Sequence, residues 1–73
     1  MRRLKRLREK RGYSQNKMQM LTGIDQSNYS KIETGKRTWT IDQCKRIAFA
    51  LDTSMDYLLG QTDDPRPYPR PGK

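Results

Sequence analysis

Three segments of the chain begin with the same local pattern, and this pattern restricts the chain to helices at those places. Ser14, Asp25 and Thr40 each have an apolar or aromatic residue immediately before them and another four positions later. A short polar side chain can accept a hydrogen bond from a free N–H at a helix start, and the two flanking residues can contact each other as a hydrophobic staple. We therefore predict a helix after each polar residue. The flanking pairs are Tyr13 and Met18, Ile24 and Tyr29, and Trp39 and Cys44.

Apolar residues elsewhere in the chain also recur at helical spacing, and no segment alternates as a half-buried strand does. We expect a first helix over residues 2–11, ended by Gly12, and a short fifth helix that begins near Thr53 or Ser54 and ends at Gly60. The sequence therefore predicts an all-α fold, a compact domain of five helices. The fourth helix is expected to supply the centre of the core through Ile41, Cys44, Ile47, Ala48 and Leu51.

Composition changes after residue 60. The segment 61–73 holds all four prolines and no residue that we assign to the core. We therefore predict one domain over residues 1–60, followed by a proline-rich extended tail or linker over residues 61–73.

The charge and the scarcity of reactive side chains limit the classes of function. The 73 residues carry a formal net charge of +8, which favours a polyanionic partner such as nucleic acid or an acidic membrane. With no histidine and only Cys44, we expect no disulfide, no metal, no cofactor and no enzyme activity. No apolar run approaches the roughly 18 residues of a membrane span, and no signal peptide is recognisable, so we expect a cytoplasmic protein without a membrane partner.

The second and third predicted helices are separated only by Thr22, Gly23 and Ile24. A glycine in so short a linker can adopt positive φ, which folds two helices across each other in a helix-turn-helix arrangement. At about 100° per residue, Tyr29 and Ile32 define the inward face of the third helix. The outward face is then polar and nearly uncharged at its start, a composition suited to the edges of DNA bases.

These elements resemble a known family. Residues 14–35, SQNKMQMLTGIDQSNYSKIETG, are similar to the helix-turn-helix of the phage repressor and Cro-like (XRE) DNA-binding proteins. Residues 7–15 and 46–60 resemble the first and last helices of the same family, so the similarity covers about residues 4–60. The resemblance implies a lambda-repressor-like domain that binds a double-stranded DNA operator as a transcriptional regulator, with repression the expected mode.

The resemblance also implies roles for individual residues. Residues expected to read bases are Gln26, Ser27, Asn28 and Lys31. Residues expected to contact the DNA backbone are Gln15, Lys17, Ser30, Lys36, Arg37 and Thr38. Gln15 should in addition brace Gln26, and removal of Arg37 should weaken binding to all sequences alike. Arg8 and Glu33 match a pair that forms a buried salt bridge in similar proteins. Gln19 stands where alanine is usual, so its amide should either reach solvent or widen the helix crossing.

Other hypotheses remain open from the sequence alone. The same fold could serve as an antitoxin-like or adaptor module that binds a protein, with the tail at 61–73 reaching the partner. The basic segment 1–11 could bind an acidic membrane, although its few leucines are needed by the core. Because one small domain reads about one half-site, we also expect a homodimer. Candidate dimer contacts are Met55, Tyr57 and Leu58.

Overall fold

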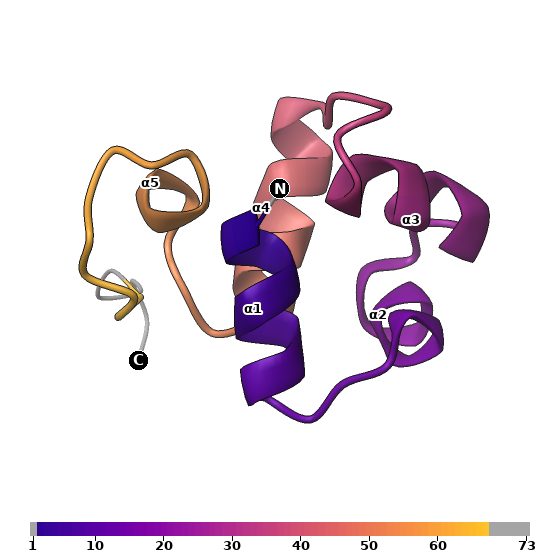
Figure 1. Cartoon of the computed structure of the whole chain (residues 1–73), viewed down its shortest axis with the longest axis horizontal. Coiled ribbons are helices and arrows are strands. Elements are labelled where there is room, and N and C mark those ends of the chain that lie inside the picture. Colours follow the sequence, from indigo (N-terminus) through magenta and orange to yellow (C-terminus); the bar gives the residue numbers. More distant parts are fainter. Residues whose placement is uncertain (1, 68–73) are drawn as a thin grey trace.

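Among residues 2–67, the part of the chain that the structure describes, five helices form and no strand does (Figure 1). The computed structural model therefore confirms the predicted all-α fold. No helix in these residues is long and apolar enough to cross a membrane. The helices are α1 (Arg2–Lys10), α2 (Gln15–Thr22), α3 (Gln26–Glu33), α4 (Ile41–Ala50) and α5 (Met55–Leu58).

All three predicted N-caps are present. The side chain of Ser14 accepts from the N–H of Lys17, and that of Asp25 accepts from the N–H of Ser27. Thr40 forms the reciprocal capping box, in which its hydroxyl accepts from the N–H of Gln43 and the Gln43 side chain accepts from the N–H of Thr40. These bonds satisfy donors that a helix start leaves free, so the helix boundaries follow from local sequence.

The described part of the predicted tail, residues 61–67, returns to the body of the domain. The guanidinium of Arg3 donates hydrogen bonds to the carbonyl of Tyr57 at 2.8 Å, to the carbonyl of Thr62 at 2.7 Å and to the Asp63 carboxylate at 3.0 Å. The hydroxyl of Thr53 donates to the carbonyl of Pro65 at 2.6 Å. The division of the chain at residue 60 stays a prediction, and residues 68–73 lie outside the described residues.

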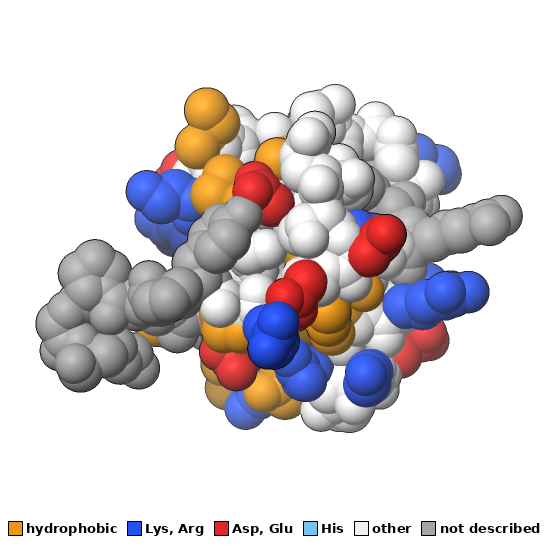
Figure 2. Space-filling model, turned by 90° about the vertical axis from the view of Figure 1, so that its left-hand side faces the viewer, with side chains coloured by type: hydrophobic (Ala, Val, Ile, Leu, Met, Phe, Trp, Pro, Cys, Tyr) orange, Lys and Arg blue, Asp and Glu red, His pale blue; other side chains and the backbone are white. Residues whose placement is uncertain are grey.

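The side of the molecule that carries α5 and this segment is not uniformly charged. Figure 2 shows basic, acidic and apolar side chains interspersed over it. Two ion pairs of the same region, Arg3 with Asp63 and Arg66 with Asp64, join opposite charges at 3.0 and 2.7 Å. The described side chains on this side therefore do not form a uniformly positive surface.

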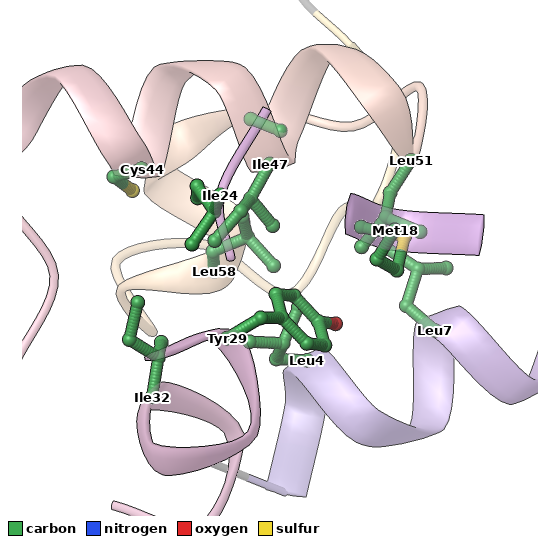
Figure 3. Close-up of a cluster of buried hydrophobic side chains, with 11 residues drawn as sticks. Leu4, Leu7, Met18, Ile24, Tyr29, Ile32, Cys44, Ile47, Leu51 and Leu58 are labelled. Carbon is green, nitrogen blue, oxygen red and sulfur yellow. The ribbon is translucent and has the colours of Figure 1, made fainter. Parts of the chain in front are cut away.

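Each of the five helices contributes at least one side chain to a single core (Figure 3). Helix α2 packs on α3 and α4, α4 packs on α5, and α1 packs on α3. The ring of Tyr29 lies in the middle of this cluster in the view of Figure 3. The buried apolar residues are Leu4, Leu7, Met18, Ile24, Tyr29, Ile32, Cys44, Ile47, Ala48, Leu51 and Leu58.

One prediction about burial is wrong, and one candidate dimer contact has almost no exposed surface. Ile41, assigned to the core stripe of α4, is 76% exposed. It is the first residue of the helix and lies about 60° away from the centre of the stripe, so it falls at the edge of the packed face. Leu58, a candidate dimer contact, is only 5% exposed because it is inserted into the core at the end of α5. It is withdrawn from the candidate contacts.

Candidate nucleic-acid interface

The turn between α2 and α3 is held by hydrogen bonds on both sides of Gly23. Gly23 has φ +73° and its N–H donates to the carbonyl of Gln19 at 2.9 Å. The buried hydroxyl of Thr22 donates to the carbonyl of Met18 at 2.6 Å and accepts from the N–H of Ile24 at 3.1 Å. A β-carbon at Gly23 would be strained by this φ and would lie 3.3 Å from the guanidinium of Arg46. The angle between the two helices is therefore set by the turn itself.

Gln19 joins α2 directly to the start of α3. Its side-chain oxygen accepts a hydrogen bond from the N–H of Gln26 at 2.6 Å, and its side chain is half-buried. The hydrogen bond of the Gln19 amide lies at an exposed position, as one of the two alternatives expected, and neither alternative anticipated its partner. The first turn of α3 receives two side-chain acceptors, one from Asp25 and one from Gln19.

The two faces of α3 are as the helical spacing predicted. Tyr29, Ile32 and Glu33 are buried, whereas Gln26, Ser27 and Lys31 are exposed. Asn28 and Ser30 are half-buried on the borders of the exposed face. Side-chain amides, a hydroxyl and one ammonium group are thus presented on a helix whose other face is fixed in the core. This chemistry matches that of side chains which contact base edges in the major groove.

The loop after α3 folds back on the helix. Gly35 has φ +83°, and its N–H donates to the carbonyl of Ile32 at 3.2 Å. The N–H groups of Lys36 and Arg37 both donate to the carbonyl of Lys31, at 2.8 and 3.1 Å. This arrangement satisfies carbonyls at the end of the helix and keeps two cationic residues beside it.

The side chain of Arg37 contacts a predicted base-reading residue. Its Nη1 donates to Oδ1 of Asn28 at 2.9 Å, nine positions earlier in the chain. Lys36, Arg37 and Thr38 are all exposed, as is Lys17 in the first turn of α2. Their predicted contacts with DNA phosphates stay predictions, but none of these side chains is buried.

A buried ion pair fixes the C-terminal end of α3 to α1. Arg8 donates through Nε to Oε2 of Glu33 at 2.9 Å and through Nη2 to Oε1 at 2.8 Å. A third bond, from Nη1 of Arg8 to the carbonyl of Tyr13 at 2.7 Å, ties the pair to the segment before α2. Such a two-bond contact between a guanidinium and a carboxylate holds both groups in one orientation.

Gln15 contacts this ion pair. Its side-chain amide donates to Oε1 of Glu33 at 3.4 Å. The residue that hydrogen-bonds Gln26 is therefore Gln19, through the backbone, and the structure records for Gln15 a contact with Glu33. The expected phosphate contact of Gln15 stays a prediction.

The ion pair should make folding sensitive to acid. Burial raises the pKa of Glu33, but the hydrogen bonds that its carboxylate receives, first among them those of Arg8, together with the charge of Arg8, outweigh burial, and the pKa lies below its ordinary value of 4.5. A carboxylate with a lowered folded-state pKa stabilises the fold above its unfolded-state pKa, and that stability is lost as the pH falls through the folded value. We expect the urea concentration at the midpoint of unfolding to decrease when the pH is lowered below about 4.

Unfolding measured between pH 3 and pH 7 checks this expectation. Glu33→Gln should show a smaller fall across the same range, whereas Glu9→Gln, at an exposed site on α1, should follow the unmodified chain. Equal acid dependence in all three proteins would show that Glu33 is not responsible.

The three predicted dimer contacts on α5 differ in how much of each side chain is exposed. Met55 and Tyr57 are half-buried against the core, and the guanidinium of Arg3 lies 4.4 Å above the centre of the Tyr57 ring. Leu58 is buried, while Leu59 beside it is exposed. The homodimer itself stays a prediction.

Three sets of contacts between elements were not predicted from the sequence. They are the bond from Gln26 to Gln19, the bond from Arg37 to Asn28 and the set of bonds made by Arg3. Each joins residues from different elements, and no local pattern identifies the partners. The polar type of residues 19 and 28 was the only signal available.

Two crossed helices, a three-residue turn and an outer helix with one polar face define a helix-turn-helix domain. A family model described as a helix-turn-helix domain matches residues 1–63, and the chain belongs to this family. The assignment from the resemblance is thereby confirmed at the level of the helix-turn-helix.

Two relatives from Bacillus subtilis (strain 168) are named as regulators. The chain is 34% identical to the uncharacterized HTH-type transcriptional regulator YobD over 65 residues, which cover 89% of this chain and 58% of the relative. It is 37% identical to the SPbeta prophage-derived uncharacterized HTH-type transcriptional regulator YonR over 60 residues, which cover 82% and 56%. The chain thus spans little more than half the length of these relatives. No solved structure matches significantly.

Proposed function

We propose that the chain binds double-stranded DNA in a sequence-specific manner, as the DNA-reading part of a cytoplasmic transcriptional regulator of the phage repressor and Cro-like (XRE) kind. The observation that carries this proposal is the exposed polar face of α3, held from below by the Arg8–Glu33 pair and by the core. A prophage-derived regulator among the relatives supports the phage-repressor type.

The proposed interface divides into two kinds of contact. Gln26, Ser27, Asn28 and Lys31 read base edges from the major groove. A second set of residues contacts the phosphates of the DNA backbone and so positions the domain. These residues are Gln15, Lys17, Ser30, Lys36, Arg37 and Thr38. The net charge of +8 supplies the long-range attraction to DNA.

One domain of this size covers about one half-site, so we propose that two copies bind a palindromic operator. Repression is the mode of action that we expect, because a protein seated on an operator blocks other proteins from the same DNA. Met55 and Tyr57, with Leu59 in place of Leu58, are the residues on or next to α5 that a partner copy could contact.

Selection from a random double-stranded DNA pool tests the proposal. We expect one enriched, two-fold symmetric sequence, whose affinity falls steeply as salt rises while it remains preferred over other sequences. Gln26→Ala should relax the preference at one position of each half-site. A pool that shows no enrichment would refute base reading, and capture of a stoichiometric protein without any DNA shift would favour the adaptor hypothesis.

A further inference from the structure

The contact between Arg37 and Asn28 determines which way the Asn28 amide faces. A guanidinium has only N–H donors and no acceptor, so the atom that it approaches must be the amide oxygen. At 2.9 Å from Nη1 of Arg37, Oδ1 of Asn28 is engaged, and the NH2 group of the amide points away from Arg37. The two orientations of an asparagine amide are therefore not equivalent here.

The backbone of the loop keeps Arg37 in this position. The N–H groups of Lys36 and Arg37 share the carbonyl of Lys31, and Gly35 makes the turn at φ +83°. Asn28 is itself in the first turn of α3, whose start is capped by Asp25 and Gln19. Both partners are thus held by backbone contacts that do not depend on DNA.

This orientation changes what Asn28 can read. An asparagine pairs with adenine by accepting from the N6 amino group through its oxygen and donating to N7 through its NH2. Arg37 engages one of the two lone pairs of this oxygen, and its positive charge makes the other a weaker acceptor and the NH2 group a stronger donor, so Asn28 offers chiefly donors. Guanine presents two acceptors in the major groove, N7 and O6, and thymine presents O4.

We propose that Arg37 is a positioning residue that holds Asn28 with its NH2 toward the DNA, so that Asn28 selects guanine or thymine and discriminates against adenine. This inference rests on the proposed function, since it names the bases read at one place in that interface. Arg37 retains further N–H donors for a phosphate, so one side chain joins backbone contact to base choice. Removal of the Arg37 side chain should therefore alter the base preference at the Asn28 position as well as the overall affinity for DNA.

The experiment is a selection from a random double-stranded DNA pool, run in parallel with the full chain and its variants. Asn28→Ala identifies the operator position that Asn28 reads, because that position loses its preference. Arg37→Ala should lose about ten-fold in preference at the same position and admit adenine there, within the range for one base contact. Lys36→Ala removes the same charge from the same loop and should weaken all sequences alike with the motif unchanged.

A second variant keeps the test decisive if Arg37→Ala binds too weakly to select. Asn28→Asp retains an acceptor for Arg37 but replaces the NH2 donors by a carboxylate oxygen. It should move the preferred base toward cytosine, whose N4 amino group is a donor. Circular dichroism of each variant should show unchanged helix content.

A preferred base pair alone does not identify the strand that Asn28 reads, so base analogues are placed on each strand at the Asn28 position. The inference is overturned if binding there depends on the N6 amino group of adenine or the N4 amino group of cytosine. It is also overturned if Asn28→Ala changes no position, or if Arg37→Ala and Lys36→Ala return the same motif. A different failure, in which the unmodified chain enriches no sequence at all, would refute the proposed function and the role of Arg37 with it. If the unmodified chain enriches an operator and Arg37→Ala enriches the same motif, only the role of Arg37 is refuted.

Discussion

Arg8→Ala is expected to destabilise the domain by about 3–5 kcal/mol, the range for breaking a buried ion pair by removing one partner. The side chains of Arg8 and Glu33 are 11% and 2% exposed, so the carboxylate left behind could not be rehydrated in place. The variant would also lose the bond from Arg8 to the carbonyl of Tyr13. Because the single core of a chain of this size supplies only about 3–5 kcal/mol of stability, a large fraction should be unfolded at 37 °C.

Urea unfolding followed by circular dichroism checks this prediction. The matched control is the double variant Arg8→Met with Glu33→Leu, which removes both charges and restores apolar volume. We expect the double variant to be more stable than Arg8→Ala, since no charge is left buried without a partner. If Arg8→Ala unfolds at the same urea concentration as the unmodified chain, the pair does not anchor α3.

The second large effect concerns binding. Lys31→Glu is expected to lower affinity for the selected operator about 100-fold or more, because bringing like charges together at an interface costs several kcal/mol. Lys31 is exposed on the polar face of α3, so the fold should not change. The measurement is a fluorescence-anisotropy titration with operator DNA at fixed salt.

Lys10→Glu is the charge-matched control for Lys31→Glu. Lys10 is exposed at the end of α1 and lines a surface hollow with Pro65, on the side of residues 61–67, which lie across the molecule from α3 (Figure 1). We expect Lys10→Glu to weaken binding much less than Lys31→Glu, through the change in overall charge alone. Equal losses would indicate that DNA is attracted by net charge and not by the face of α3.

The sequence was sufficient for what depends on near neighbours in the chain. The caps at Ser14, Asp25 and Thr40 involve bonds over two or three residues, and all three are present. The inward direction assigned to Tyr29 and Ile32, from their residue type and their helical spacing, agrees with their burial. Such features are encoded locally, so a single sequence can reveal them.

The features that could not be predicted from the sequence depend on how separate helices pack against one another. Ile41 has the right spacing for the core stripe but lies beyond the area that the other helices cover. Gln19 has an ordinary helical position, and only the crossing of α2 and α3 brings it to the N–H of Gln26. In the same way, nothing near Asn28 in sequence indicates that Arg37 will return to it. Long-range partners of this kind require the three-dimensional arrangement.

The contacts of Arg3 have a practical consequence for how the domain can be shortened. Arg3 is near one end of the chain, yet its hydrogen bonds go to residues 57, 62 and 63 near the other. A fragment that starts at Leu4 would lose all three bonds, and a fragment that stops at Gly60 would leave the Arg3 guanidinium with one of its three acceptors. Protein engineers who transplant this domain should therefore treat its two boundaries as one choice.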